Sequence, residues 1–85
     1  MIEVMVIRKG AMMPRAKDIV CAYINPLCIS DIHPPFHDAF KLHYGFLWAT
    51  TSGSKYFYGF CESEPDRESK VDTYYHEFLK IVGVS

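Results

Sequence analysis

Two aromatic segments separated by a short polar turn constrain the fold of this chain more than any other feature. Residues 44–49 read Tyr-Gly-Phe-Leu-Trp-Ala and residues 56–61 read Tyr-Phe-Tyr-Gly-Phe-Cys, with Thr-Thr-Ser-Gly-Ser-Lys between them. Strand side chains alternate between two faces, so a hairpin with one solvated face should alternate apolar and polar residues. Here both faces are apolar or small along most of their length. The rest of the chain, or a partner, must therefore cover two faces.

The turn between these segments determines which aromatic rings share a face. Gly53 suits the left-handed position that closes a three-residue loop over residues 51–53. This loop predicts the strand pairs Trp48 with Tyr56, Phe46 with Tyr58, and Tyr44 with Phe60, which gathers all six rings on one face. A two-residue turn at 52–53 would slip the register and place large residues opposite glycines. We prefer the aromatic-face register, although the sequence leaves both open.

The first part of the chain carries one clear signal and one divided signal. Residues 2–7 are apolar and β-rich and predict a strand. In residues 14–24 the helical spacing of four apolar side chains favours a helix, while the β-branched run 19–24 is equally typical of a strand. The four are Ala16, Ile19, Val20 and Tyr23. We expect the helix and keep the strand as the alternative.

The remaining segments complete the expected architecture. Residues 26–35 predict a loop, and Pro34-Pro35 is expected to open a short helix that ends near His43. Residues 66–82 predict a helix, because six apolar side chains recur at helical spacing and Gly83 suits the C-terminal cap. These six are Val71, Tyr74, Tyr75, Phe78, Leu79 and Val82.

These elements predict a small α+β fold in a single domain, residues 1–85. Its antiparallel sheet would combine the aromatic hairpin with the N-terminal strand, and the C-terminal amphipathic helix would pack on one face. A chain this short buries a modest core, so its stability should be a few kcal/mol.

Composition narrows the classes of function. A net charge of −1 argues against a strongly basic nucleic-acid-binding protein and against an acidic DNA mimic. Basic residues concentrate in residues 1–20 and acidic ones in 61–85; ordinary solvated faces are the simplest explanation, and pairing between the two ends stays open. No apolar run approaches the length of a membrane span, and three irregularly spaced cysteines do not suggest a disulfide framework. We expect a soluble, cytoplasmic protein without membrane contact.

The candidate site for metal or thiol chemistry is the segment from Cys28 to His37, with Cys21 upstream. Two thiolates and two imidazoles, from Cys21, Cys28, His33 and His37, are a ligand set that zinc accepts, but their spacing matches no tight zinc knuckle. Cys28 with a histidine base is also the residue pair of a nucleophilic thiol. A polar turn explains the segment as well. We therefore expect no cofactor, no metal and no catalytic residue.

The aromatic hairpin is the candidate binding surface. Lys55 followed by aromatic residues is consistent with stacking of unpaired bases, although the overall charge supplies little attraction for phosphate. Tyrosine, tryptophan and phenylalanine are enriched at protein interfaces. We expect a non-catalytic accessory or inhibitor-type module, of the kind mobile elements also encode, that binds a protein partner or a second copy of itself through Tyr44, Phe46, Trp48, Tyr56, Tyr58 and Phe60. A zinc-stapled domain, single-stranded nucleic-acid binding and a Cys/His thiol enzyme are the alternatives.

Overall fold

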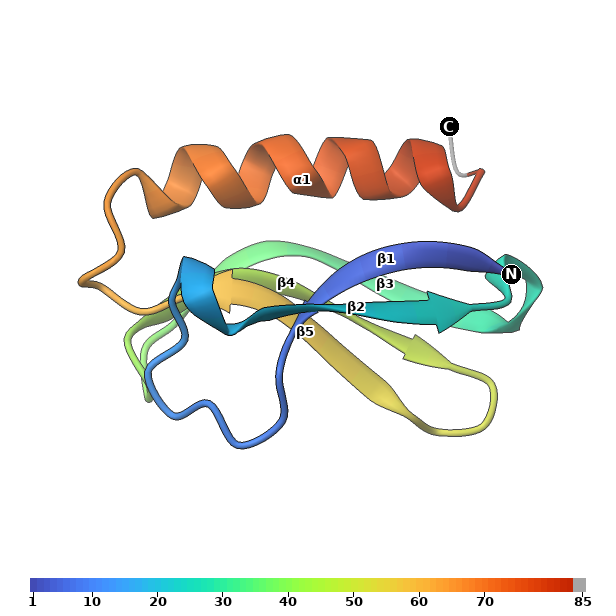
Figure 1. Cartoon of the computed structure of the whole chain (residues 1–85), viewed down its shortest axis with the longest axis horizontal. Helices are drawn as coiled ribbons and strands as arrows, with labels where there is room; N and C mark the ends of the chain where they lie inside the picture. The colour runs from blue at the N-terminus through green and yellow to red at the C-terminus, as the bar shows by residue number, and fades with distance from the viewer. Residues whose placement is uncertain (84–85) are drawn as a thin grey trace.

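A single long helix lies across a layer of β-strands in the computed structural model, which describes residues 1–83 (Figure 1). The elements in chain order are β1 (Ile2–Ile7), β2 (Ile19–Ile24), β3 (Ile29–Asp38), β4 (His43–Thr50), β5 (Lys55–Phe60) and α1 (Arg67–Ile81). Short 3-10 turns at Ala16–Asp18 and Pro26–Cys28 precede β2 and β3. No helix in the described part of the chain is long and apolar enough to cross a membrane.

The strands form two antiparallel sheets, so the predicted small α+β class is confirmed. One sheet has the order β1-β2 and the other has the order β3-β4-β5. The N-terminal strand is therefore not hydrogen-bonded into the hairpin's sheet as expected; β1 pairs with β2 and packs beside β5. Side chains of both sheets and of α1 share one hydrophobic core.

The preferred register of the aromatic hairpin is confirmed. Trp48 lies opposite Tyr56, Phe46 opposite Tyr58 and Tyr44 opposite Phe60. The turn follows the expected geometry, because Gly53 has a φ of 91° and its N–H donates to the carbonyl of Thr50 over 3.0 Å. A residue with a side chain would be strained at this positive φ.

The C-terminal helix is confirmed within one residue at each end and covers the aromatic face. Val71, Tyr74 and Phe78 are its buried residues. The Phe78 ring lies 5.3 Å from Phe46 and 5.2 Å from Trp48, measured between ring centroids. The helix ends before Gly83, whose φ of 82° is the expected left-handed cap.

Two predicted helices are strands in the structure. The expected helix over residues 14–24 is wrong, because residues 19–24 form β2, where the β-branched run pairs along the whole of β1. The expected loop at 26–35 and short helix near 35–43 are also wrong, because β3 covers residues 29–38. In both segments tertiary pairing overrides a helical spacing of only a few residues.

β3 accommodates its prolines because it is an edge strand with an irregular register. Its pairing with β4 shifts between Ile29 and Asp31 and again between His33 and Phe36, on either side of Pro34-Pro35. Proline lacks the N–H that a central strand would need, so it is tolerated at edges and bulges. The two shifts also change which face the later side chains of β3 occupy.

We predict that Phe78 carries a large share of the stability. Phe78 is fully buried against Phe46 and Trp48, so Phe78→Ala should lower the free energy of unfolding by about 3–5 kcal/mol. Lys80 is exposed on the same helix, and Lys80→Ala should change it by less than about 0.5 kcal/mol. Denaturant titration measures both values. Similar small losses in the two variants would show that α1 is not the principal cover of the sheet.

Candidate functional site

The six predicted binding residues form the floor of the core. Phe46 and Trp48 are completely inaccessible, Tyr58 and Phe60 are at most 5% exposed, and only Tyr44 and Tyr56 keep part of their surface. The Trp48 ring stacks on Tyr56, with 4.3 Å between ring centroids, and on Phe78, with 5.2 Å between ring centroids. The chain's own helix thus supplies the cover that we had expected from a partner. The four rings buried in the core, Phe46, Trp48, Tyr58 and Phe60, are therefore not accessible to a partner.

At the margin of the core, Tyr44 joins the hairpin to the outer side of α1. Its hydroxyl donates to the carboxylate of Asp72 over 2.7 Å. Burial, and then the hydrogen bond to this carboxylate, raises the pKa of Tyr44 to about 12. The raised pKa means that burial and the nearby carboxylate both favour the neutral phenol, which donates this hydrogen bond.

The predicted metal or thiol residues are not brought together. Cys21 lies on β2, whereas Cys28 ends the turn before β3. His33 is opposite Leu47, and its Nε2 lies 3.2 Å from Asp31 Oδ2. His37 is opposite Tyr44, and its Nε2 lies 3.6 Å from Glu68 Oε1. The register shift between the two histidines places them on opposite faces of the sheet. Within residues 1–83 no three potential ligands form a cluster that could hold a metal.

The opposite face of the three-stranded sheet is organised around a pair of glycines. Gly45 and Gly59 lie directly opposite each other on β4 and β5, and the Phe57 ring folds over both. A Cβ added at Gly45 would clash with the carbonyl oxygen of Tyr58 and come within 2.6 Å of both the Gly59 Cα and Phe57 Cζ, so only glycine allows the two backbones and the ring to approach this closely. His43 flanks the ring with a centroid distance of 6.5 Å. Phe57 and Leu47 lie outside the core cluster and remain partly accessible.

This second face forms one wall of a groove that encloses about 450 Å³. The end of β1 and the segment that follows it form the other wall. We call it the second-face groove; the lining residues used below are the apolar Phe36, Leu47 and Phe57 and the charged Arg8, Lys9, Asp38, Lys41 and Lys55. Phe36 is 36% exposed, so an aromatic edge is open to solvent in the groove.

The groove carries a positive charge that the rest of the molecule does not. Its charged lining comprises four cations, Arg8, Lys9, Lys41 and Lys55, against Asp38 alone, whereas the whole chain has a net charge of −1. Asp38 is already occupied as an acceptor for the backbone N–H groups of its own turn. Within the described residues, Lys9, Lys41 and Lys55 make no ion pair. These lysines are available to an anionic ligand.

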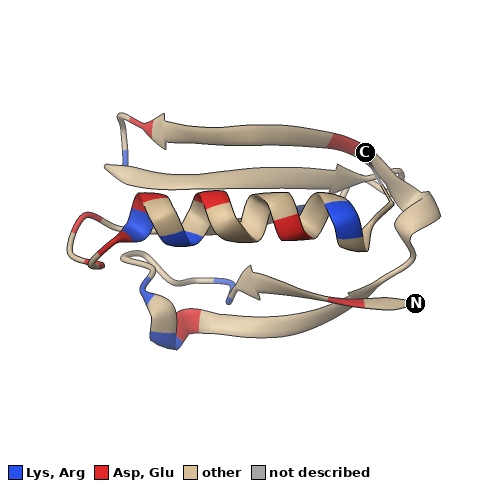
Figure 2. Ribbon diagram, turned by 90° about the horizontal axis from the view of Figure 1, so that it is seen from above, with Lys and Arg blue, Asp and Glu red and all other residues tan. Residues whose placement is uncertain are grey.

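Exposed apolar side chains continue the groove at one end of the molecule. Met12 is 86% exposed, Met13 68% and Leu42 58%, and together they line a hollow that shares Lys41 and His43 with the groove. We call these three residues the loop patch. Figure 2 shows that the connection between β1 and β2 and the turn between β3 and β4 both lie at the end where α1 begins. The loop patch therefore adds accessible aliphatic surface next to the groove.

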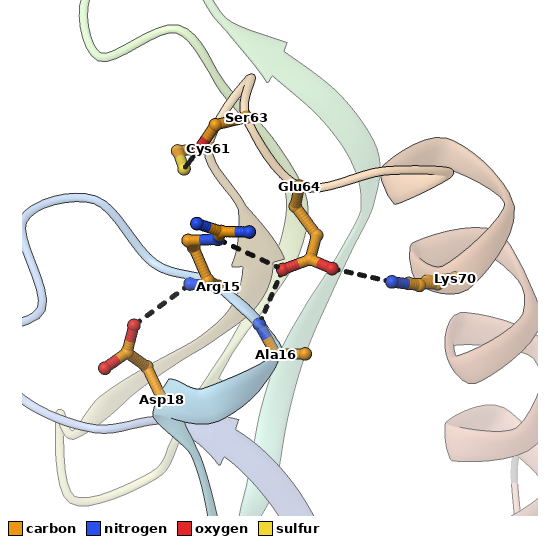
Figure 3. Close-up of polar contacts among 7 residues, drawn as sticks. All are labelled: Arg15, Ala16, Asp18, Cys61, Ser63, Glu64 and Lys70. Atoms are coloured by element: carbon orange, nitrogen blue, oxygen red, sulfur yellow. Dashed lines mark hydrogen bonds and ion pairs between the residues drawn. The ribbon is translucent and has the colours of Figure 1, made fainter.

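A buried carboxylate holds the segment that forms the second wall. Figure 3 shows Glu64 between the N-terminal segment and the helix. Its carboxylate accepts hydrogen bonds from Lys70 Nζ over 2.6 Å and from the Ala16 N–H over 2.8 Å, and Arg15 Nε lies 3.7 Å away. The hydrogen bond from Lys70, and then that from Ala16, holds the pKa of Glu64 below its ordinary value of 4.5. The basic beginning and the acidic end of the chain thus meet here within one molecule.

Two further contacts fix the same segment. Asp18 accepts hydrogen bonds from the Arg15 N–H over 3.0 Å and from Arg8 Nε over 2.9 Å, and the first of these chiefly lowers the pKa of its carboxyl. The buried Pro14 accepts from the Cys61 N–H over 2.7 Å. The basic wall of the groove is therefore tied to β5 and to α1.

Comparison with known proteins leaves the structure as the guide to function. None of three searches, against protein-family models, curated proteins and solved structures, finds a match to this chain.

We predict that Glu64 makes stability depend on acid pH. Because its pKa is lower in the folded protein, its contribution is complete above the ordinary value of 4.5 and is lost as the pH falls through the folded-state pKa. Glu64→Gln should cost about 1–3 kcal/mol at pH 7 and flatten the loss of stability below about pH 5. Exposed Glu62→Gln is the matched control. Urea titrations across this range give the measurement, and parallel curves for wild type and Glu64→Gln would contradict the assignment.

Proposed function

We propose that this protein is a small, non-catalytic binding module that holds an acidic, extended segment of a partner protein in the second-face groove. The observation that carries the proposal is that three lysines, which make no ion pair with any residue in the range 1–83, coincide with an apolar surface outside the core. Neither property alone is unusual, because solvated lysines and single exposed apolar residues are common. Together, in one concave site, they suit a ligand that carries both carboxylates and apolar side chains.

The apolar part of the groove supports recognition of side chains. The end of the Phe57 ring lies over Gly45 and Gly59, so Phe57 offers a partly accessible aromatic surface on this face. Leu47 lies opposite Phe57 across the strand pair, and Phe36 lies on the same face. Apolar residues of the partner would bury against these rings, and their carboxylates would reach the lysines at the rim.

The loop patch supports a protein rather than a nucleic acid as the ligand. Met12, Met13 and Leu42 extend the groove with flexible aliphatic surface, which adapts to protein side chains but gives no stacking platform for bases. Single-stranded nucleic acid is the second candidate, because Phe36 and Phe57 lie among cations. Nucleic acid is the weaker candidate because Phe57 is half-buried and so offers little ring surface for a base to stack on.

The cysteines support the expected compartment. Cys21 and Cys28 are free and exposed, and Cys61 is free and buried. Exposed thiols persist in a reducing environment, so we include a cytoplasmic location in the proposal.

The test uses a synthetic extended peptide that alternates glutamate with leucine. We expect chemical-shift changes in NMR spectra at Leu47, Phe57 and Lys55, and affinity that falls with added salt. Lys55→Glu and Lys41→Glu should each weaken binding by roughly threefold or more, whereas Lys80→Glu on the helix should not. Phe36→Ala, on the accessible edge strand, should also weaken binding.

Three outcomes would overturn the proposal. A peptide in which lysine replaces glutamate could bind as well, which would remove the electrostatic argument. The shift changes could map away from the groove. Tighter binding of oligothymidylate than of the acidic peptide, lost in the same lysine variants, would establish the nucleic-acid candidate instead.

A further inference from the structure

The two outer edges of the strand layer differ in how well they are protected. β3 forms one edge, where two register shifts and Pro34-Pro35 interrupt the ladder and so obstruct pairing with another strand. β2 forms the other edge, and its six residues, Ile-Val-Cys-Ala-Tyr-Ile, pair with β1 without any shift. Within this strand Val20 is 42% exposed, Tyr23 64%, and Cys21 is exposed as well. β2 carries none of the usual protections of an edge, since it has no charge, proline or bulge.

The hydrogen bonds of β1 show which backbone groups of β2 point outward. Arg8 N–H donates to the Asp18 carbonyl over 2.9 Å, so the pair Arg8–Asp18 is a hydrogen-bonded one. Met5 N–H donates away from β2, to the Tyr74 hydroxyl over 2.7 Å, so the pair Met5–Cys21 is not. Hydrogen-bonded and non-hydrogen-bonded pairs alternate in an antiparallel ladder. Ile19, Cys21 and Tyr23 therefore direct their N–H and C=O groups to the free edge.

We propose that β2 is the site of self-association, in which two copies pair antiparallel about a two-fold axis at Cys21. Hydrogen bonds form between the two copies only in a register that places outward-directed residues opposite one another. A register centred on Cys21 pairs all three outward-directed residues of each β2 strand. Cys21 then lies opposite its own copy, and Ile19 lies opposite Tyr23 of the second copy. The result is a continuous sheet in the order β1-β2-β2-β1.

The strand suits a second copy of this chain better than a foreign one. β2 is uncharged and apolar, so it presents no charge for a foreign strand to recognise, whereas its own sequence matches it in this register. The flanking charges do not meet, because Lys17 comes opposite Asn25 and Asp18 opposite Ile24. The Tyr23 hydroxyl donates to Glu3 on β1 over 2.9 Å, which draws the ring over its own sheet and away from the edge.

Charge pairs at position 21 test the register. We expect wild-type protein to show a concentration-dependent dimer in sedimentation equilibrium. Cys21→Lys and Cys21→Glu should each shift the protein to monomer, because like charges would face each other across the axis. An equimolar mixture of the two variants should dimerise again. Position 21 makes no backbone hydrogen bond to β1, so circular dichroism should show both variants folded.

Cross-linking gives an independent readout on the full chain. With Cys28→Ser and the buried Cys61 retained, a short bismaleimide should join two copies through Cys21, since facing Cα atoms in such a pair lie about 5.5 Å apart. The matched protein with Cys21→Ser and Cys28 retained should cross-link far less.

Monomeric wild type up to millimolar concentration would overturn the proposal. So would a dimer that neither charge affects, or one that the mixture fails to restore. Val20 is the one β2 residue that lines the groove, and the lysines and aromatic residues on which peptide binding rests lie outside β2. Failure here therefore leaves peptide binding to be judged by the variants of Lys41, Lys55 and Phe36.

Discussion

The packing of α1 on the aromatic face is the interaction on which the rest of the structure depends. Phe46, Trp48 and Phe78 are completely inaccessible, and the Phe78 ring contacts both of the others. A hairpin alone is at best marginally stable in water, and this one becomes part of a core only when the helix closes over it. Tyr74 extends the same contact to the second sheet, because its hydroxyl accepts the Met5 N–H. One helix therefore unites two sheets that share no strand ladder.

The other face of the hairpin is not covered by α1 and does not belong to the core. Gly45 and Gly59 bring the backbones close, and Phe57 fills the space above them without joining the core. The chain uses Pro14, hydrogen-bonded to Cys61, to bring its basic N-terminal connection beside that face. The groove therefore results from the way the core is closed, because both of its walls are held in place by residues that also stabilise the fold.

The hairpin, its register and the helix are predictable from the sequence because each of them depends on a local signal. Gly53 fixes the turn, and the stripe through Val71 and Phe78 has a full helical length. The helix predicted over residues 14–24 is wrong because residues 19–24 become a strand by pairing with β1, which lies outside the local stretch of sequence on which the helix prediction depends. The strand β3 is not predicted because Pro34-Pro35 normally indicates the end of a strand, and only the structure shows that β3 is an edge strand, where proline is tolerated.

The candidate site was less predictable than the fold. The aromatic residues were recognised as one face, but the sequence did not reveal that the helix would cover that face in preference to the opposite one. Lys9, Lys41 and Lys55 are far apart in the chain, and only the tertiary structure gathers them around Phe57. A signal was nevertheless present: Gly45 and Gly59 fall opposite each other in the preferred register, which marks a place where a ring must fold over the backbone.

The order of the elements has a consequence for how the protein forms. α1 follows all five strands in the chain, so during synthesis the rings of β4 and β5 leave the ribosome before the residues that bury them. The contact between Met5 and Tyr74 spans 69 positions, and contacts of such separation form late and slowly. For that interval Phe46, Trp48, Tyr58 and Phe60 are open to any apolar surface nearby. Until α1 docks, these rings form an apolar surface of the kind that chaperones bind and that promotes aggregation.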